Sequence, residues 1–205
     1  PKRAKKLFFD IIPKTTDEYF SHLKKYAEQT AEQKIENPVW HLHNGQPGNI
    51  NFPVTYTLLL NLASVCHAED IDVVWSYVSS YAPNLKRSAE LDTLIQLAVN
   101  YYKEKIEPFK KYRLPDEKER EGIFELVQIL KTLDQNTSSD EIQSIIFAIG
   151  KKLEYENLRD WFKGLYETVL GQSEGPRMGS FIKLYGIQAT QLLLEKVLEG
   201  DLTNK

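Results

Sequence analysis

Cations beside aromatic rings are the side chains of this sequence that point most directly to chemistry. The stretch FKKYR, Phe109 to Arg113, combines two rings with three cations. Arg159, Lys163 and Tyr166 recur at i, i+4 and i+7, which places them on one face of a helix. Single-stranded nucleic acid uses both side-chain types, because cations contact phosphates and rings stack on bases. The alternative for each set is a solvated helix surface, and the helix dipole also favours cations at a C-terminus.

A glycine-rich stretch follows the second set, from Gly171 to Gly186, with the sequence GQSEGPRMGSFIKLYG. It contains four of the ten glycines, the only methionine, and Arg177. Because it lies between two periodic helical segments, it is either a hinge packed under two helices or a place where backbone and side chains meet a ligand. Arg177 separates the two interpretations, since a hinge does not need this cation.

A His-x-His pair offers a different kind of site. His41 and His43 flank one residue beside Trp40, and Cys66 or His67 would have to complete a metal site. This spacing matches no usual zinc pattern. The preferred interpretation is therefore that Trp40 packs on the helices and that the imidazoles form hydrogen bonds within their own loop.

Acid–base chemistry has one candidate cluster, formed by His67, Glu69, Asp70 and Asp72. Asp70 and Asp72 stand at the start of a predicted helix, where carboxylates ordinarily cap backbone N–H groups. The sequence also has no phosphate-binding glycine motif, no nucleophile elbow and no His-Glu-x-x-His zinc motif. A self-sufficient enzyme is therefore not predicted.

The composition is that of a soluble globular chain. Of 205 residues, 41% are hydrophobic and 27% charged, and the net charge of −3 gives no overall basic field. A nucleic-acid site would have to be a local patch. The single cysteine, Cys66, excludes an internal disulfide framework and suits a reducing cytoplasm. The longest apolar run, Val54 to Cys66, is too short to span a bilayer, so a cytoplasmic location and no membrane partner are expected.

Helices must position these residues, because apolar residues recur at helical spacing and no strand alternation or constant repeat is visible. The sequence predicts an all-α fold of eight or nine helices packed as antiparallel neighbours. One helix is expected from Thr15 to about Lys34, an aperiodic loop from Ile35 to Phe52, and a subdivision near residues 133–139. Pro108 should break the longest helix, which begins at Ala89. Helix-starting side-chain caps are expected at Thr15, Asp70, Ser88, Asp116, Ser138 and Asn157.

Several long segments together resemble the C-terminal part of class I lysyl-tRNA synthetases. The segments are PKRAKKLFFDIIPKTTDEY, ENPVWHLHNGQP, LLLNLASVCHAED, YYKEKIEPFKKYRLPDE and RDWFKGLYETVLGQSEGPRMGSFIKLYG. The similarity covers nearly the whole chain, and the last segment and PKRAKKLFFD are its strongest parts.

The resemblance implies an organisation for the whole protein. In that family a class I catalytic domain with HIGH-like and KMSKS-like ATP motifs comes first, and neither motif occurs here. The chain would then be a fragment without the catalytic domain of an ATP-dependent lysine–tRNA ligase. ATP and Mg²⁺ would belong to that parent enzyme, and no cofactor or metal is expected in this chain. The upstream catalytic domain and lysine tRNA would be its partners.

The resemblance also implies a division of labour along the chain. Residues 1–30 would form a stem-contact region, and residues 31–205 an α-helical cage that binds the lysine anticodon, as in class I aminoacyl-tRNA synthetases. Anticodon bases are unpaired and are read by stacking and by hydrogen bonds to base edges. The lysine anticodons share uridines at two positions.

Individual contacts follow from residue types within that framework, because the resemblance does not assign them. Anticodon contacts are expected from Arg159, Lys163, Tyr166, Arg177, Met178, Ser180 and Phe181, with Trp40, His41 and His43 as a second wall. Contacts with the tRNA backbone are expected from Lys2, Arg3, Lys5, Lys6, Lys110, Lys111 and Arg113.

Two other functions are compatible with the sequence. A helical protein-interaction scaffold without RNA binding fits the nearly neutral net charge. A small metal-dependent hydrolase would use His41, His43 and His67.

Overall fold

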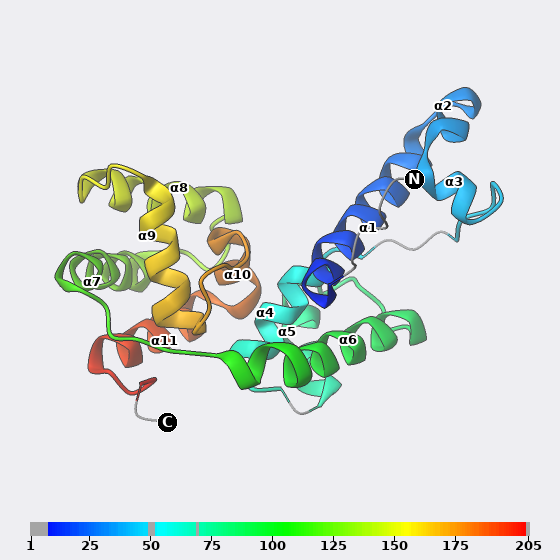
Figure 1. The fold of residues 1–205 in the computed structure, drawn as a ribbon. Coiled ribbons are helices and arrows are strands. Elements are labelled where there is room, and N and C mark those ends of the chain that lie inside the picture. The colour runs from blue at the N-terminus through cyan, green and yellow to red at the C-terminus, as the bar shows by residue number, and fades with distance from the viewer. Residues whose placement is uncertain (1–7, 49–51, 69, 204–205) are drawn as a thin grey trace, which may run out of the picture. The chain divides into compact units, whose positions relative to one another are not determined.

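The computed structural model describes residues 8–48, 52–68 and 70–203, and over these residues it contains eleven α-helices and no strand (Figure 1). The prediction of an all-α fold is confirmed. The chain divides into two compact units, residues 1–57 and residues 58–205. This division is structural, whereas the boundary near residue 30 concerns function and stays a prediction. Among the described residues, no helix is both long enough and apolar enough to cross a bilayer.

The first unit is built on one long helix and two short ones. They are α1 (Ile12–Glu28), α2 (Ala31–Glu36) and α3 (Pro38–Leu42), with a single 3₁₀ turn, Phe9–Ile11, before them. The predicted start at Thr15 is wrong, because α1 begins three residues earlier with Pro13 in its first turn, where a fixed φ is favourable. The predicted continuation to Lys34 is also wrong, because the chain breaks at Gln29 and Thr30 begins α2 with a full capping box.

Helix α3 lies within the stretch that was predicted to be an aperiodic loop. Asn37 starts it: its side-chain oxygen accepts a hydrogen bond from the N–H of Val39 at 3.0 Å, and Pro38 occupies the first helical position. A short helix therefore carries Trp40 and His41, and the loop prediction holds only for part of residues 35–52.

The second unit contains the remaining helices. They are α4 (Tyr56–Val65, of which the first two residues belong to the first unit), α5 (Ile71–Tyr81), α6 (Ala89–Tyr101), α7 (Glu117–Thr132), α8 (Ser139–Lys152), α9 (Leu158–Leu165), α10 (Met178–Tyr185) and α11 (Ile187–Glu199). Two of these helices run on into π-helical turns, η2 (Tyr102–Ile106) after α6 and η4 (Tyr166–Leu170) after α9. As predicted, the helix does not continue through Pro108. After η2 the chain forms the 3₁₀ turn η3 (Glu107–Phe109), which contains Pro108.

Five helices of the second unit begin at the predicted side chains. In each case the side chain accepts a hydrogen bond from a backbone N–H of the first turn, which removes one unpaired donor and stabilises the helix by about 1 kcal/mol. The confirmed caps are Asp70, Ser88, Asp116, Ser138 and Asn157.

Helices α7, α8 and α9 pack on one another (Figure 1). The indole of Trp161 lies among them, and two glycines face it. Trp161 of α9 is fully buried, and its Nε1 donates a hydrogen bond to the Ile146 carbonyl at 3.0 Å. A Cβ at Gly122 of α7 or at Gly150 of α8 would lie within 2.7 Å of the indole. The backbones of both helices thus approach the ring as closely as glycine allows. Residues 133–138 connect α7 to α8, and both helices belong to the second unit.

Candidate nucleic-acid interface

Two pockets of the second unit share one wall, formed by Gly171–Gly175 and called here the dividing segment. The Phe109 pocket, of about 600 Å³, is lined by Lys105, Phe109, Lys111, Gln172, Ser173 and Glu174 among others. The Tyr166 pocket, of about 650 Å³, is lined by Phe147, Arg159, Phe162, Tyr166, Ser173 and Glu174 among others. Because Ser173 and Glu174 line both pockets, the dividing segment separates two neighbouring pockets.

The dividing segment is fixed at both ends by hydrogen bonds. At its start, Gly171 has φ +67° in the left-handed region, and its carbonyl accepts from the N–H of Lys111 at 2.9 Å. Just beyond its end, the Tyr166 hydroxyl donates to the carbonyl of Pro176 at 2.8 Å. Burial raises the pKa of Tyr166, which keeps the hydroxyl protonated and able to donate. These hydrogen bonds therefore restrain the wall between the pockets at both ends.

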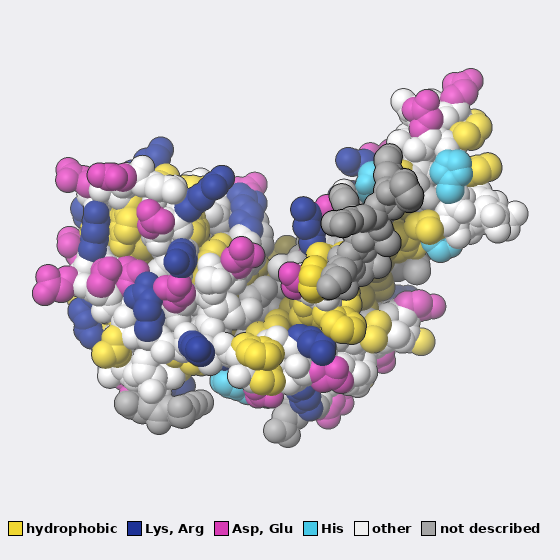
Figure 2. Space-filling view, viewed as in Figure 1, with side chains coloured by type: hydrophobic (Ala, Val, Ile, Leu, Met, Phe, Trp, Pro, Cys, Tyr) yellow, Lys and Arg dark blue, Asp and Glu magenta, His cyan; other side chains and the backbone are white. Residues whose placement is uncertain are grey.

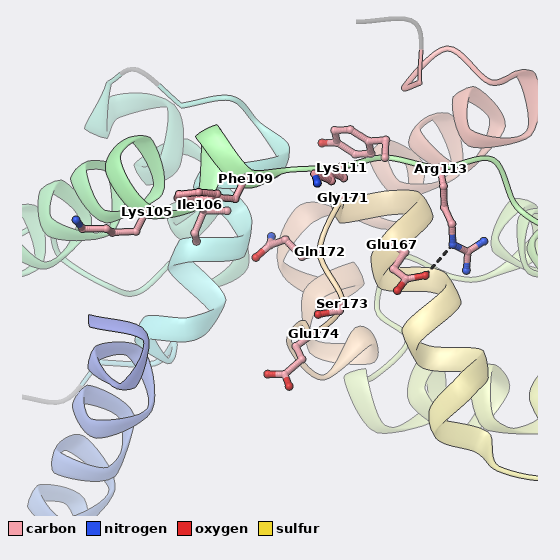
Figure 3. Close-up of a pocket in the computed structure, with 11 residues that line it drawn as sticks. Lys105, Ile106, Phe109, Lys111, Arg113, Glu167, Gly171, Gln172, Ser173 and Glu174 are labelled. Carbon is pink, nitrogen blue, oxygen red and sulfur yellow. Dashed lines mark hydrogen bonds and ion pairs between the residues drawn. The ribbon is translucent and has the colours of Figure 1, made fainter. Parts of the chain in front are cut away.

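The Phe109 pocket presents an aromatic ring and a cation to solvent. Phe109 is 73% exposed and lies on the turn after η2, and Lys111 follows it as an exposed side chain. Figure 3 shows Phe109 on one side of the pocket, Gln172, Ser173 and Glu174 on the other, and Lys111 beside Gly171. Both π-helical turns contribute to the lining, η2 through Lys105 and Ile106 and η4 through Glu167. Such turns are frequent at functional sites.

Arg113 lines the same pocket, but its guanidinium is engaged by two carboxylates. Nη1 and Nη2 lie 2.6 Å from the two Glu119 oxygens, and Nε lies 2.7 Å from Glu167. The Glu119 side chain is only 5% exposed. Burial by itself would raise its pKa, but hydrogen bonds from Arg113 and from the Asp116 N–H outweigh that effect and lower it. Arg113 is therefore part of a structural ion-pair network rather than an available phosphate contact.

Lys110 and Lys111, which the sequence predicts as a pair of backbone contacts, have different surroundings. Lys110 Nζ donates to the Ser64 carbonyl at 3.0 Å and lies 5.0 Å from the centre of the Tyr112 ring. Lys111 is exposed and lines the Phe109 pocket. Of the two, Lys111 is the one placed to meet a ligand there. The other cationic cluster, Lys2, Arg3, Lys5 and Lys6, lies outside the described residues.

The Tyr166 pocket brings together the helix face predicted from spacing. Arg159 and Lys163 are exposed on α9, and Tyr166 follows on η4. Phe147 from α8 and Phe162 from α9 add two rings, whose centres lie 5.0 Å apart in an edge-to-face contact. Phe162 in turn lies 6.4 Å from Tyr166. Three neighbouring rings and two cations line one pocket.

The residues after the dividing segment belong mostly to the core. Met178 and Phe181 have no exposed surface, so neither ring nor thioether can face an anticodon base as expected from the sequence. Ser180 is half-buried, and Arg177 lies 2.6 Å from Asp140 in an exposed ion pair. The rest of the expected stretch is helix α10, which packs against α8.

Gly179 supports the hinge interpretation of this stretch. A Cβ there would collide with the carbonyl oxygen of Ser139, and the Gly179 N–H donates to the buried side chain of Gln143 at 2.8 Å. Glycine thus allows α10 to approach α8 closely. Contact with a ligand is therefore expected from residues 171–175 of this stretch, which line the pockets.

Trp40, His41 and His43 lie in the first unit and are described by themselves. His43 Nε2 and the Tyr19 hydroxyl are 2.9 Å apart, and Gly45 packs against the indole of Trp40. His41 is exposed, with its ring 5.1 Å from Trp40. The hydrogen bond of His43 therefore goes to helix α1, not to its own loop as the preferred interpretation expected. Across residues 8–48, 52–68 and 70–203, no three His, Cys, Asp or Glu side chains are grouped to hold a metal ion.

Sequence reasoning missed Phe147, Gln172 and Glu174. Phe147 had a usable signal: it falls off the apolar stripe Ile142, Ile146 and Ile149 of an amphipathic helix, so an exposed ring was to be expected there. Gln172 and Glu174 had none, because their place in the pockets depends on how the chain folds back after η4.

Figure 2 shows basic and acidic side chains interspersed over the visible face of the second unit. This distribution agrees with the net charge of −3 and with the expectation that any nucleic-acid contact is a local patch rather than a broad basic field.

Comparisons with known proteins give one consistent result. Over 199 residues the chain is 46% identical to a lysine–tRNA ligase of Rickettsia felis, covering 95% of this chain and 38% of that protein. It is 45% identical over 202 residues to a lysine–tRNA ligase of Rickettsia bellii and 42% identical over 204 residues to one of Roseobacter denitrificans. The chain spans 38–39% of the length of these relatives. No protein-family model matches it.

Proposed function

Because the chain is homologous to the C-terminal region of lysine–tRNA ligases, we propose that it is the part of such an enzyme that binds the anticodon of lysine tRNA. The parent enzyme is of class I, acts in the cytoplasm, and carries out ATP- and Mg²⁺-dependent lysylation in a catalytic domain upstream of this chain. The chain itself contributes binding and discrimination, not chemistry.

The observation that carries this proposal is the pair of pockets on either side of the dividing segment. Each pocket combines aromatic rings with exposed cations, which is the combination that unpaired RNA requires. An anticodon is a run of unpaired bases, whereas helical RNA would offer side chains a shallow groove and few exposed base faces. Two adjacent pockets suit two successive bases that are turned out of their stack.

Roles for the lining residues follow from their chemistry. A base stacks on the exposed ring of Phe109 in one pocket, and another on Phe147 and Phe162 in the other. Lys111, Arg159 and Lys163 neutralise the phosphates that connect these nucleotides. Met178, Phe181 and Arg113 have no part in this arrangement, because the first two are buried and the third is held by Glu119 and Glu167.

A binding measurement tests the proposal. The full chain is titrated with lysine tRNA, and with the same tRNA in which the anticodon uridines are replaced by cytidine, at several salt concentrations. We expect affinity to fall with salt, because phosphate contacts release counterions, and to fall further on replacing the uridines. Equal affinity for both tRNAs would refute anticodon recognition. Absence of binding to bulk tRNA at low salt would favour the helical protein-interaction scaffold.

A further inference from the structure

The side-chain amide of Gln172 is not fully satisfied within the protein. Its Nε2 atom is buried and has no hydrogen-bond partner among the described residues, a property it shares with Ser64 Oγ and the Tyr155 hydroxyl. Of these three groups, Gln172 is the one that lines the Phe109 pocket. Buried polar groups in folded proteins nearly always have a partner, so an unpaired amide in a pocket wall indicates that something else completes it.

The position of this amide is set by the backbone. The hydrogen bond from the N–H of Lys111 to the carbonyl of Gly171 holds the two chain segments together, so Lys111 and Gln172 project from adjoining positions. Figure 3 shows the Gln172 side chain directed from the dividing segment toward the side of the pocket that carries Ile106 and Phe109. A flat ligand stacked on Phe109 would therefore present its edge to Gln172.

We propose that Gln172 reads the edge of a uridine base that stacks on Phe109, which makes it a specificity-determining residue. This inference rests on the proposed function. A glutamine amide offers a carbonyl acceptor and two N–H donors side by side. The uracil edge offers an N3–H donor between two carbonyl acceptors, so one amide pairs with N3–H and with one carbonyl at the same time. The terminal torsion of a glutamine side chain has a broad energy profile. Rotation about this torsion turns Nε2 of Gln172 from its buried position to the base.

The same amide discriminates against cytosine. Cytosine presents an amino group where uracil has a carbonyl, and an unprotonated N3 acceptor where uracil has N–H. In the amide orientation that pairs with uracil, cytosine therefore places acceptor against acceptor at N3 and donor against donor at its amino group. The Phe109 pocket prefers a base in which carbonyls flank an N–H.

The test compares Gln172→Met with the wild-type chain. Methionine keeps the length of the side chain and removes both the donor and the acceptor. Affinity is measured for lysine tRNA and for the tRNA with cytidine in place of the anticodon uridines. We expect Gln172→Met to bind the uridine tRNA about tenfold more weakly and the cytidine tRNA as the wild type does, since one hydrogen-bonded base edge is lost. Gln128→Met, at an exposed position on α7, is the matched control and should change neither affinity.

The outcomes separate this inference from the proposal on which it rests. If the wild type discriminates between the two tRNAs and Gln172→Met discriminates equally well, Gln172 does not read the base and the inference is overturned. An equal loss for both tRNAs would also overturn it, because it would indicate a general disturbance of the pocket. If the wild type itself does not discriminate, the anticodon proposal fails and the inference fails with it. Circular dichroism of each variant verifies that the helices are intact.

Discussion

The hydroxyl of Tyr166 donates a hydrogen bond to the carbonyl oxygen of Pro176 at 2.8 Å, across nine intervening residues that comprise the rest of η4 and the dividing segment. The ring of Tyr166 also packs against Gly175, where a Cβ would lie 2.5 Å from it. One side chain of a π-helical turn thus fixes the far end of the wall that both pockets share.

Removing the Tyr166 hydroxyl should weaken both the fold and the wall that the two pockets share. We expect Tyr166→Phe to lower the free energy of unfolding by about 1 kcal/mol, because the Pro176 carbonyl loses its partner. Urea denaturation measures this change. Tyr155→Phe is the matched control, since the Tyr155 hydroxyl is buried without a hydrogen-bond partner among the described residues and its removal should cost nothing. Equal destabilisation by both variants would contradict the role assigned to the Tyr166 hydroxyl.

Phe109 should matter for RNA and hardly at all for stability. Because the ring is 73% exposed, we expect Phe109→Ala to change the free energy of unfolding by less than about 0.5 kcal/mol. Loss of one base–ring stack should weaken tRNA binding by about tenfold or more. Phe124→Ala removes a ring that is 57% exposed on α7, outside both pockets, and should leave binding unchanged. Similar binding losses for the two variants would indicate a nonspecific surface effect.

Replacing Lys111 and replacing Lys110 should have different effects. We expect Lys111→Ala to weaken tRNA binding and to reduce the slope of log affinity against log salt by about one, because one phosphate contact is lost. Lys110→Ala should leave that slope unchanged and lower the free energy of unfolding by about 1 kcal/mol, through loss of the hydrogen bond to Ser64. Salt titrations and urea denaturation of both variants decide the matter. The reverse pattern would assign the phosphate contact to Lys110.

The ion pair of Arg113 should be structural. Arg113→Met leaves the buried Glu119 carboxylate without its guanidinium, so we expect a loss of about 3 kcal/mol in the free energy of unfolding. The double variant Arg113→Met/Glu119→Met should recover part of this loss, because the uncompensated charge is gone. A stable Arg113→Met variant with reduced tRNA affinity would show that the guanidinium serves RNA instead.

Glu119 should also contribute to acid sensitivity. Its pKa is lower in the folded state, so ionised Glu119 stabilises the fold fully above the ordinary glutamate pKa of about 4.3. This contribution is lost as the pH falls through the lower folded-state pKa. Glu119→Gln should therefore be less stable than the wild type near pH 7, with a smaller further loss on acidification. Denaturation curves across this pH range, with the exposed Glu121→Gln as control, test the sign.

Local sequence signals predicted the helices better than the pockets. Asp116 and Ser138 were identified as caps because a cap is decided by a few neighbouring residues. The capping box of Thr30 and Gln33 is visible in the sequence, but it lies within the stretch predicted as one helix up to Lys34. The break between α1 and α2 was therefore missed. Gly45 and the other turn residues of the following stretch similarly hid the short helix α3.

The residues proposed for binding divide in the same way. Helical spacing placed Arg159, Lys163 and Tyr166 on one face, because that spacing depends on one helix alone, and all three line the Tyr166 pocket. Phe181 was expected at the surface but lies in the core, because that outcome depends on how α10 packs against α8. Gln172 gave no signal, since an unpaired buried amide exists only once distant segments meet.

The dividing segment, tied to Lys111 at one end and to Tyr166 at the other, has a kinetic consequence. A loop that is already ordered loses little conformational entropy when a ligand arrives, so less of the interaction energy is consumed in arranging the site. Association should then proceed without a slow rearrangement of the protein, at rates set by diffusion and electrostatic attraction. Differences in affinity among anticodons should consequently reside in the lifetime of the complex rather than in how fast it forms.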